Sequence, residues 1–115
     1  MSYFLGPLYP DIDLIYGHND DMALGGLQVF EQMNRNVFVV GVDGLMEAVG
    51  AIVDGRYHGT AMNDPAYLGQ LAVETAVSLA KGENTPEYID GGTALIDASN
   101  ASEFYDESQA FAMMK

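Results

Sequence analysis

The sequence predicts an α/β fold in which a parallel sheet is built from repeated strand-and-helix units. Short β-branched or aromatic runs alternate with longer segments that carry apolar residues at helical spacing. Asn, Asp or Gly punctuates the passage from each run to the next segment. Three such units in succession, joined by right-handed crossovers, make a parallel sheet. A length of 115 residues suits one domain.

The first predicted unit is a strand over Asp13–Gly17 and a helix that runs to about Met33. The strand is predicted from its apolar and aromatic centre, which indicates burial. Asn19 and Asp20 follow the strand, and both residue types are good N-caps. The helix carries apolar residues at positions i, i+4 and i+7, which are Ala23, Leu27 and Phe30.

Two further units follow along the chain. The continuous β-branched run Val37–Val42 is typical of a strand covered on both faces, and Leu45–Asp54 is predicted to be the helix after it, with Gly55 at its end. Tyr57–Met62 is a weaker third strand. Asp64 and Pro65 open the third helix, which continues to about Lys81.

The end of the chain is predicted to be less regular. Ala94–Asp97 is expected to form a short strand after a polar loop. Asn100 is expected to cap a last short helix that ends at about Tyr105. The tail Asp106–Lys115 is expected to fray.

Composition limits the function. The chain has 17 Asp and Glu against 4 Lys and Arg, a net charge of −13, which disfavours nucleic acid, anionic membranes and polyphosphates as partners. A neutral ligand fits this charge best, and a cationic ligand is possible. Cysteine is absent, which excludes thiolate metal sites and cysteine nucleophiles. Met1–Pro10 lacks the basic residues and cleavage site of a secretory signal.

Polar side chains follow each of the three predicted strands. They are Asn19 with Asp20, then Asp43, then Asn63 with Asp64. Because ligands of parallel α/β sheets bind beyond the carboxyl ends of the strands, these groups are expected at one ligand edge. Carboxylates and amides together suit a ligand rich in hydroxyl groups, such as a sugar. The alternative at each position is a purely structural N-cap or Asp-Gly turn.

Other chemistry at this edge is weighed on the same residues. His18 ends the first strand and could face the ligand or bond a backbone carbonyl. Asp20, Asp43 and Asp64 could hold Mg²⁺ for phosphoryl transfer, but neither lysine lies near a strand's carboxyl end. No dinucleotide-binding glycine motif or serine-nucleophile elbow occurs. We therefore expect a binding module with no catalytic residues, no bound metal and no cofactor.

The stretch from Asp11 to Gly25, with its Asn-Asp-x-Met-Ala-x-Gly element, resembles a segment of the type I periplasmic sugar-binding proteins, the ribose- and galactose-binding group. Val39–Gly44, which ends in Gly-x-Asp-Gly, resembles their next strand and turn. Ala51–Thr60 and the helix after Asn63-Asp64-Pro65 follow in the same order. The resemblance extends to about Phe104.

This resemblance implies that Asn19, Asp43 and Asn63 contact the sugar. It also implies an incomplete type I fold, because the family has two α/β lobes joined by three hinge strands. On this basis residues 1–63 are part of the C-terminal lobe. Residues 64–92 are a helix and loop of the N-terminal lobe, and residues 93–115 are a strand returning through the hinge with the C-terminal tail.

The resemblance has three functional implications. The full-length parent would be periplasmic or at the cell surface and would deliver sugar to the membrane subunits of an ABC importer. A chain without the partner lobe would expose apolar surface and self-associate. The effector domain of a LacI-type transcription regulator shares the fold and remains an alternative, although such regulators commonly have Asp-Asp where this chain has Asp43 and Gly44.

Overall fold

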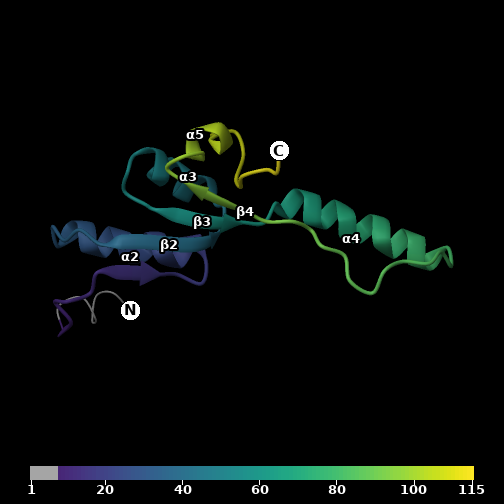
Figure 1. Cartoon of the computed structure of the whole chain (residues 1–115), viewed down its shortest axis with the longest axis horizontal. Helices are drawn as coiled ribbons and strands as arrows, with labels where there is room; N and C mark the ends of the chain where they lie inside the picture. The colour runs from purple at the N-terminus through teal and green to yellow at the C-terminus, as the bar shows by residue number, and fades with distance from the viewer. Residues whose placement is uncertain (1–7) are drawn as a thin grey trace.

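The computed structural model describes residues 8–115. The prediction about an export signal in Met1–Pro10 falls largely on residues 1–7, which lie outside this range. Within the range, strands and helices alternate as the sequence predicts (Figure 1). The elements are β1 Leu14–Tyr16, α2 Asp20–Gln32, β2 Phe38–Asp43, α3 Met46–Val53, β3 Gly59–Met62, α4 Pro65–Ala80, β4 Ala94–Asp97 and α5 Ala101–Phe104.

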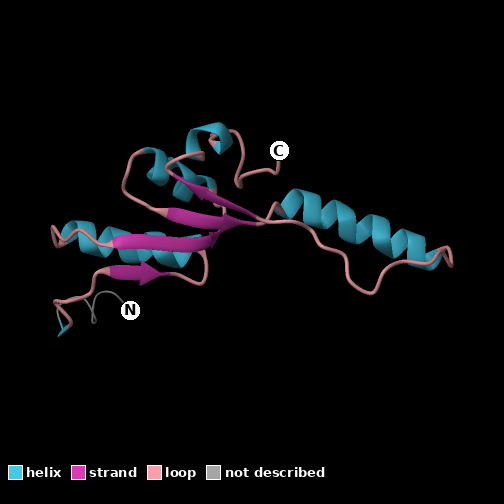
Figure 2. Cartoon of the chain, in the orientation of Figure 1, coloured by secondary structure: helices cyan, strands magenta, loops and turns pink. Residues whose placement is uncertain are grey.

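The sheet has four strands in the order β1-β2-β3-β4. The first three are parallel, which confirms the prediction, with Ile15 opposite Val39 and Val40 opposite Gly59. The fourth strand is antiparallel to β3. Its direction follows from the path of the chain, because α4 leaves at the carboxyl end of β3 and the loop after it runs back beside α4 to the same edge (Figure 2).

The core lies between one face of the sheet and helices α2, α3 and α5. Helix α2 contributes Phe30 and helix α3 contributes Val49, and both belong to one buried cluster with Val39, Met62 and Ile96 of the strands. These strand residues project from the same face of the sheet. Both crossover helices therefore cover a single face, which is the consequence of two right-handed connections made in the same direction.

The opposite face of the sheet is exposed and apolar. Its side chains include Leu14, Tyr16, Phe38 and Leu95, each of which is more than half exposed. A parallel sheet normally has layers on both faces, because its strands are apolar on both sides. The predictions of a buried first strand and of a second strand covered on both faces are therefore wrong for this face of the described chain, which no layer covers. We refer to these four residues as the open face.

Helix α4 stands apart from the sheet. None of its residues is buried, and the molecule extends 58 Å along its longest axis because α4 and the returning loop project from one end (Figure 1). The helix begins as predicted, with Asp64 capping it and Pro65 in its first turn. The helix ends at Ala80 with Lys81 as its C-cap, and Gly82 follows with a φ of 76°, as expected for the residue after the cap. No helix among residues 8–115 is long and apolar enough to cross a membrane.

Two predictions about the end of the chain are wrong. The tail does not fray: Ala112 is fully buried and its N–H donates to the Gly44 carbonyl, while Phe111 forms a bridge to Leu45. The tail pairs with the turn after β2 because that turn offers unpaired backbone groups, a contact between distant segments with no local signature. Asn100 precedes α5, but its side chain does not cap the helix. It bonds back to the N–H of Asp97 and the carbonyl of Leu95 instead.

Candidate functional site

Asp43 and Asn63 meet at the carboxyl ends of β2 and β3. The Asn63 amide donates to Oδ1 of Asp43 at 3.2 Å, and both side chains are partly exposed. Asp43 has a φ of 116°, a backbone conformation that L residues rarely adopt. Such strain persists only where the surrounding structure imposes it, and it concentrates at functional sites. The second carboxylate oxygen of Asp43 has no partner among residues 8–115, so it is open to a ligand.

Asn19 lies at the same edge, at the start of α2. Its Oδ1 accepts from the Met22 N–H at 2.9 Å, so Asn19 is the N-cap of the helix, as predicted. This bond fixes the orientation of the amide and leaves its NH₂ group without a partner among the described residues. The structural and the ligand-binding interpretations of Asn19 are therefore compatible, since the oxygen caps the helix and the nitrogen can donate to a ligand.

Asp20 does not face the ligand edge. It is fully buried, and its carboxylate accepts from Tyr57 Oη at 2.6 Å, Thr60 Oγ1 at 2.8 Å and the Leu45 N–H at 2.9 Å. Burial raises the pKa of Asp20 above its usual value of 3.8, while these hydrogen bonds oppose the shift. The same burial and the adjacent Asp20 raise the pKa of Tyr57, which keeps its hydroxyl as a donor.

Asp64 is also occupied by structural contacts. It is 4% exposed, with Oδ1 accepting from the Tyr67 N–H at 3.0 Å and Oδ2 accepting from the Met114 N–H at 2.9 Å. Asp64 thus caps α4 and holds the C-terminal tail at the point where the chain leaves the sheet. Neither of its oxygens points to a ligand in this arrangement.

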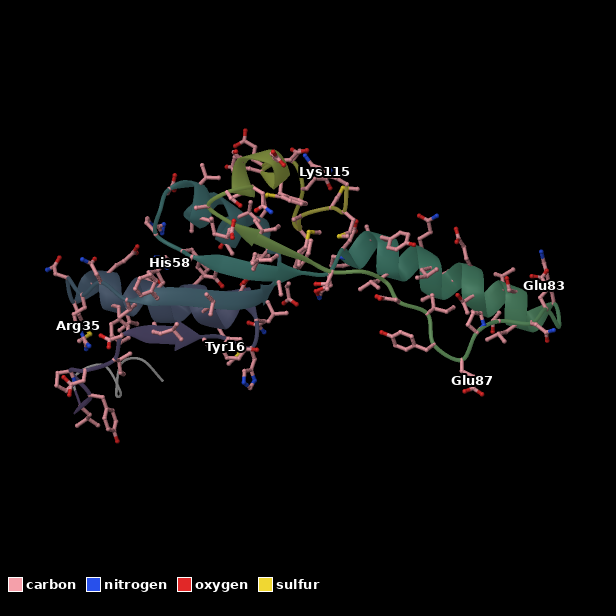
Figure 3. All side chains as sticks on the ribbon, in the orientation of Figure 1. Tyr16, Arg35, His58, Glu83, Glu87 and Lys115 are labelled. Carbon is pink, nitrogen blue, oxygen red and sulfur yellow. The ribbon has the colours of Figure 1, made fainter. Side chains whose placement is uncertain are left out.

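His18 is exposed next to Asn19. Its ring lies 5.6 Å from that of Tyr16, tilted by 58°. Figure 3 shows Tyr16 at the carboxyl end of β1. The two rings form an exposed aromatic surface beside the predicted edge. A direct contact between His18 and a ligand stays a prediction.

Two open hollows lie away from the strand ends. One of about 610 Å³ lies between α3 and the segment after α5, and one of about 550 Å³ lies between α5 and the tail. Neither includes Asn19, Asp43 or Asn63 among its lining residues. Within residues 8–115 no group of three or more His, Asp or Glu side chains is placed to hold a metal ion. Asp20, Asp43 and Asp64, the three aspartates considered for Mg²⁺, are therefore not gathered into one site.

Sequence reasoning missed Tyr57, Thr60 and Gly41. Tyr57 and Thr60 surround Asp20, and Gly41 lies against both Asp20 and Tyr57, where a Cβ would collide with their oxygens. Tyr57 and Thr60 both lie in the weakest predicted strand, Tyr57–Met62, so neither carried a recognisable pattern. The one available signal was an acidic residue directly after the N-cap, and helix capping already explained it.

The raised pKa of Asp20 predicts how stability varies with pH. Because the folded state holds this proton more tightly than the unfolded state, the contribution of Asp20 is most favourable below pH 3.8 and declines as pH rises through its folded pKa. Asp20→Asn removes the titration while one amide oxygen can still accept from Leu45 and Thr60. The free energy of unfolding of the native chain minus that of the variant should therefore fall with rising pH. A difference that rises with pH would contradict the assignment.

A parallel α/β layer with polar groups at the carboxyl ends of its strands defines a small-molecule-binding domain. The family model described as "Periplasmic binding protein domain" matches residues 1–84, and the chain belongs to this family. This match confirms the resemblance to periplasmic binding proteins that the sequence shows. The four-stranded sheet also matches solved structures of such proteins.

Several relatives are named as sugar-binding proteins. The ribose import binding protein of Bacillus subtilis is 33% identical over 81 residues, which are 70% of this chain and 27% of that protein. The D-galactose/methyl-galactoside binding periplasmic protein of Haemophilus influenzae is 36% identical over 77 residues, 67% of this chain and 23% of that protein. The chain thus spans about a quarter of the length of these relatives. Both are named as binding proteins, which agrees with the expectation of a binding module.

Solved structures agree with this assignment. An ABC transporter solute-binding protein from Mycobacterium smegmatis with bound glycerol superposes with a TM-score of 0.93 at 50% identity, covering 98% of this chain and 40% of that one. A carbohydrate transporter solute-binding protein from Agrobacterium radiobacter in complex with D-arabinose superposes with a TM-score of 0.79 at 27% identity. The superposition covers 89% of this chain and 35% of that one. The α/β architecture is therefore shared along nearly the whole chain.

Proposed function

We propose that this chain forms one side of a carbohydrate site in a solute-binding protein, with Asn19, Asp43 and Asn63 as its ligand contacts. The single observation that carries the proposal is the geometry of Asp43. Its backbone is held at a φ of 116°, its Oδ1 is oriented by Asn63, and its other oxygen is open at the carboxyl edge of the sheet. An ionised carboxylate placed in this way accepts hydrogen bonds from sugar hydroxyl groups.

The three contacts divide the recognition of hydroxyl groups between them. Asp43 offers acceptors, Asn19 offers the donors of its NH₂ group, and Asn63 links the ligand edge to the start of α4. A sugar hydroxyl both donates and accepts, so this mixture suits it better than it suits an anion. The net charge of −13 repels anions, which also favours a neutral ligand over an anionic one.

The proposal extends to the whole protein. We assign residues 1–63 to the C-terminal lobe of a two-lobed receptor, residues 64–92 to a helix and loop of the other lobe, and residues 93–115 to the return through the hinge. The absence of buried residues on α4 supports a second lobe that covers this helix. The full-length protein would be periplasmic or at the cell surface and would pass its sugar to an ABC importer, in line with the names of its relatives.

The first test is ligand binding by the full gene product that carries this chain. Isothermal calorimetry against ribose, galactose, arabinose, allose, xylitol and glycerol should detect at least one polyhydroxy ligand. A cationic compound of similar size, such as choline, is the matched control and should not bind. Binding of the cation without any of the polyols would overturn the proposal, because the acidic edge would then recognise positive charge and not hydroxyl groups.

Self-association is the expected behaviour of the 115-residue chain on its own. The open face places Leu14, Phe38 and Leu95 in solvent, and exposed apolar surface of this kind drives association. Sedimentation velocity should show species larger than a monomer, and Phe38→Ser together with Leu95→Ser should shift them toward the monomer. A compact monomer with a cooperative melt in the unaltered chain would contradict this expectation.

A further inference from the structure

The backbone of the turn after β2 is held at four polar groups, which belong to Gly44, Leu45 and Met46. The Gly44 N–H donates to Thr60 Oγ1 at 3.0 Å and the Leu45 N–H donates to Asp20 Oδ2 at 2.9 Å. The Gly44 carbonyl accepts from Ala112 at 2.7 Å, and the Met46 N–H donates to the Ala110 carbonyl at 2.9 Å. Side chains thus hold this turn from one direction and the C-terminal tail holds it from another.

This support meets a specific need of the turn. Asp43 and Gly44 both have positive φ, at 116° and 73°. Glycine adopts this conformation freely, but Asp43 does so only when its surroundings impose it. Without that constraint the Asp43 carboxylate would leave its present direction, and the ligand edge would lose its acceptor.

Asp20 contacts the turn through one oxygen only. Its Oδ2 accepts from Leu45 and Thr60, while its Oδ1 accepts from Tyr57, which makes no hydrogen bond to the turn within residues 8–115. Thr60 has a single hydroxyl hydrogen, which it donates to Asp20 in a hydrogen bond. This bond leaves the lone pairs of the Thr60 oxygen directed toward the Gly44 N–H. Asp20 therefore acts directly on the Leu45 N–H and, more weakly, on the Gly44 N–H, and it acts on Gly44 a second time through Thr60.

We propose that the buried carboxylate of Asp20 is the positioning residue of the site: through Leu45 and Thr60 it holds the turn that presents Asp43. The inference rests on the ligand role of Asp43 proposed above. It assigns to Asp20 a task that is neither helix capping, which Asn19 performs, nor ligand contact. It also separates the two oxygens, since Oδ2 serves the site and Oδ1 serves the packing of Tyr57.

Four variants separate positioning from general stability. Asp20→Ala and Thr60→Val remove the support of the turn. Tyr57→Phe removes a hydrogen bond to the same carboxylate from the side away from the turn and is the matched control. Asp20→Asn is the conservative variant, because its amide oxygen can accept from Leu45 and Thr60 while its NH₂ group faces the Tyr57 oxygen. Thr60→Val preserves shape, so the test survives if Asp20→Ala does not fold.

The readouts are amide hydrogen exchange at Gly44 and Leu45, the free energy of unfolding, and sugar affinity in the full gene product. We expect Asp20→Ala and Thr60→Val to speed exchange at these two amides more than their loss of global stability explains. We expect both to weaken sugar binding roughly 10- to 100-fold, the effect typical of residues that orient a ligating group. Tyr57→Phe and Asp20→Asn should leave local exchange and affinity close to those of the native protein.

The outcomes separate the inference from the function on which it rests. If Asp20→Ala and Thr60→Val speed exchange at Gly44 and Leu45 no more than Tyr57→Phe does, the positioning role is refuted, whatever the affinity. If exchange at the turn rises while sugar affinity stays unchanged, Asp20 holds the turn but Asp43 is not a ligand contact, and the proposed site fails instead.

Discussion

Replacing Asp43 with alanine is expected to lower sugar affinity by about 10²- to 10⁴-fold, with the fold retained. Two hydrogen bonds from sugar hydroxyls to an ionised carboxylate contribute about 1.5–3 kcal/mol each, and the alanine side chain supplies neither. Asp43 and Asn63 are both partly exposed, so the Asn63 amide that loses its acceptor can bond to water instead. Calorimetric titration of the full gene product, with circular dichroism to verify the fold, measures the effect.

A second substitution at Asp43 separates function from backbone strain. Asp43→Gly removes the same carboxylate but accommodates a φ of 116°, whereas alanine keeps a Cβ in that conformation. Asp43→Gly should therefore bind sugar as poorly as Asp43→Ala and be more stable than it by about 1 kcal/mol. Unchanged affinity in either variant would remove Asp43 from the site. An alanine variant more stable than the glycine variant would refute the strain.

Replacing Gly41 with alanine is expected to destabilise the fold by about 2–5 kcal/mol. A Cβ at this position would overlap Tyr57 Oη and Asp20 Oδ1, two buried atoms that are hydrogen-bonded to each other. Relief requires that the strand shift or that this hydrogen bond break, and both overpacking and an unpaired buried group are costly. Chemical unfolding in urea measures the loss.

Gly25 supplies the matched control. It lies within α2, and a Cβ there would meet no atom within 4 Å. Gly25→Ala should therefore raise the free energy of unfolding by about 0.5–1 kcal/mol, since alanine is the better helix former. Equal effects of the two substitutions would show that the space around Gly41 is not constrained as described.

Much of the fold could be predicted because its signals are local. Asn19 before an amphipathic segment, Asp64 with Pro65 before another, and glycines at positions 55 and 82 mark helix ends through hydrogen bonds made within a few residues. The continuous β-branched run at Val37–Val42 correctly predicts the strand β2, but its expected cover on both faces is wrong, because Phe38 lies on the exposed face. The carboxyl edge then follows from topology, because successive parallel strands must end on the same side.

The remainder depends on contacts between distant residues. Asp20 and Thr60 are 40 positions apart, and Ala112 reaches Gly44 from the far end of the chain. Neither residue of these pairs lies in a sequence pattern that identifies its partner. The sequence alone therefore predicts Asp20 at the ligand edge and a frayed tail. The proximity of Asn63 to Asp43 could be predicted without any such long-range contact, because each residue stands at the carboxyl end of one of two neighbouring parallel strands.

The most direct test of the ligand edge is to map sugar binding onto the backbone by NMR. Amide shifts of the full gene product should be recorded while the tightest-binding polyol from the calorimetric panel is added. The largest changes are expected at Asn19, at Asp43 to Leu45 and at Asn63, which together form the carboxyl edge of the sheet. Changes confined to the hollows between α3, α5 and the tail would contradict this site, and the carbohydrate contacts would have to be sought there.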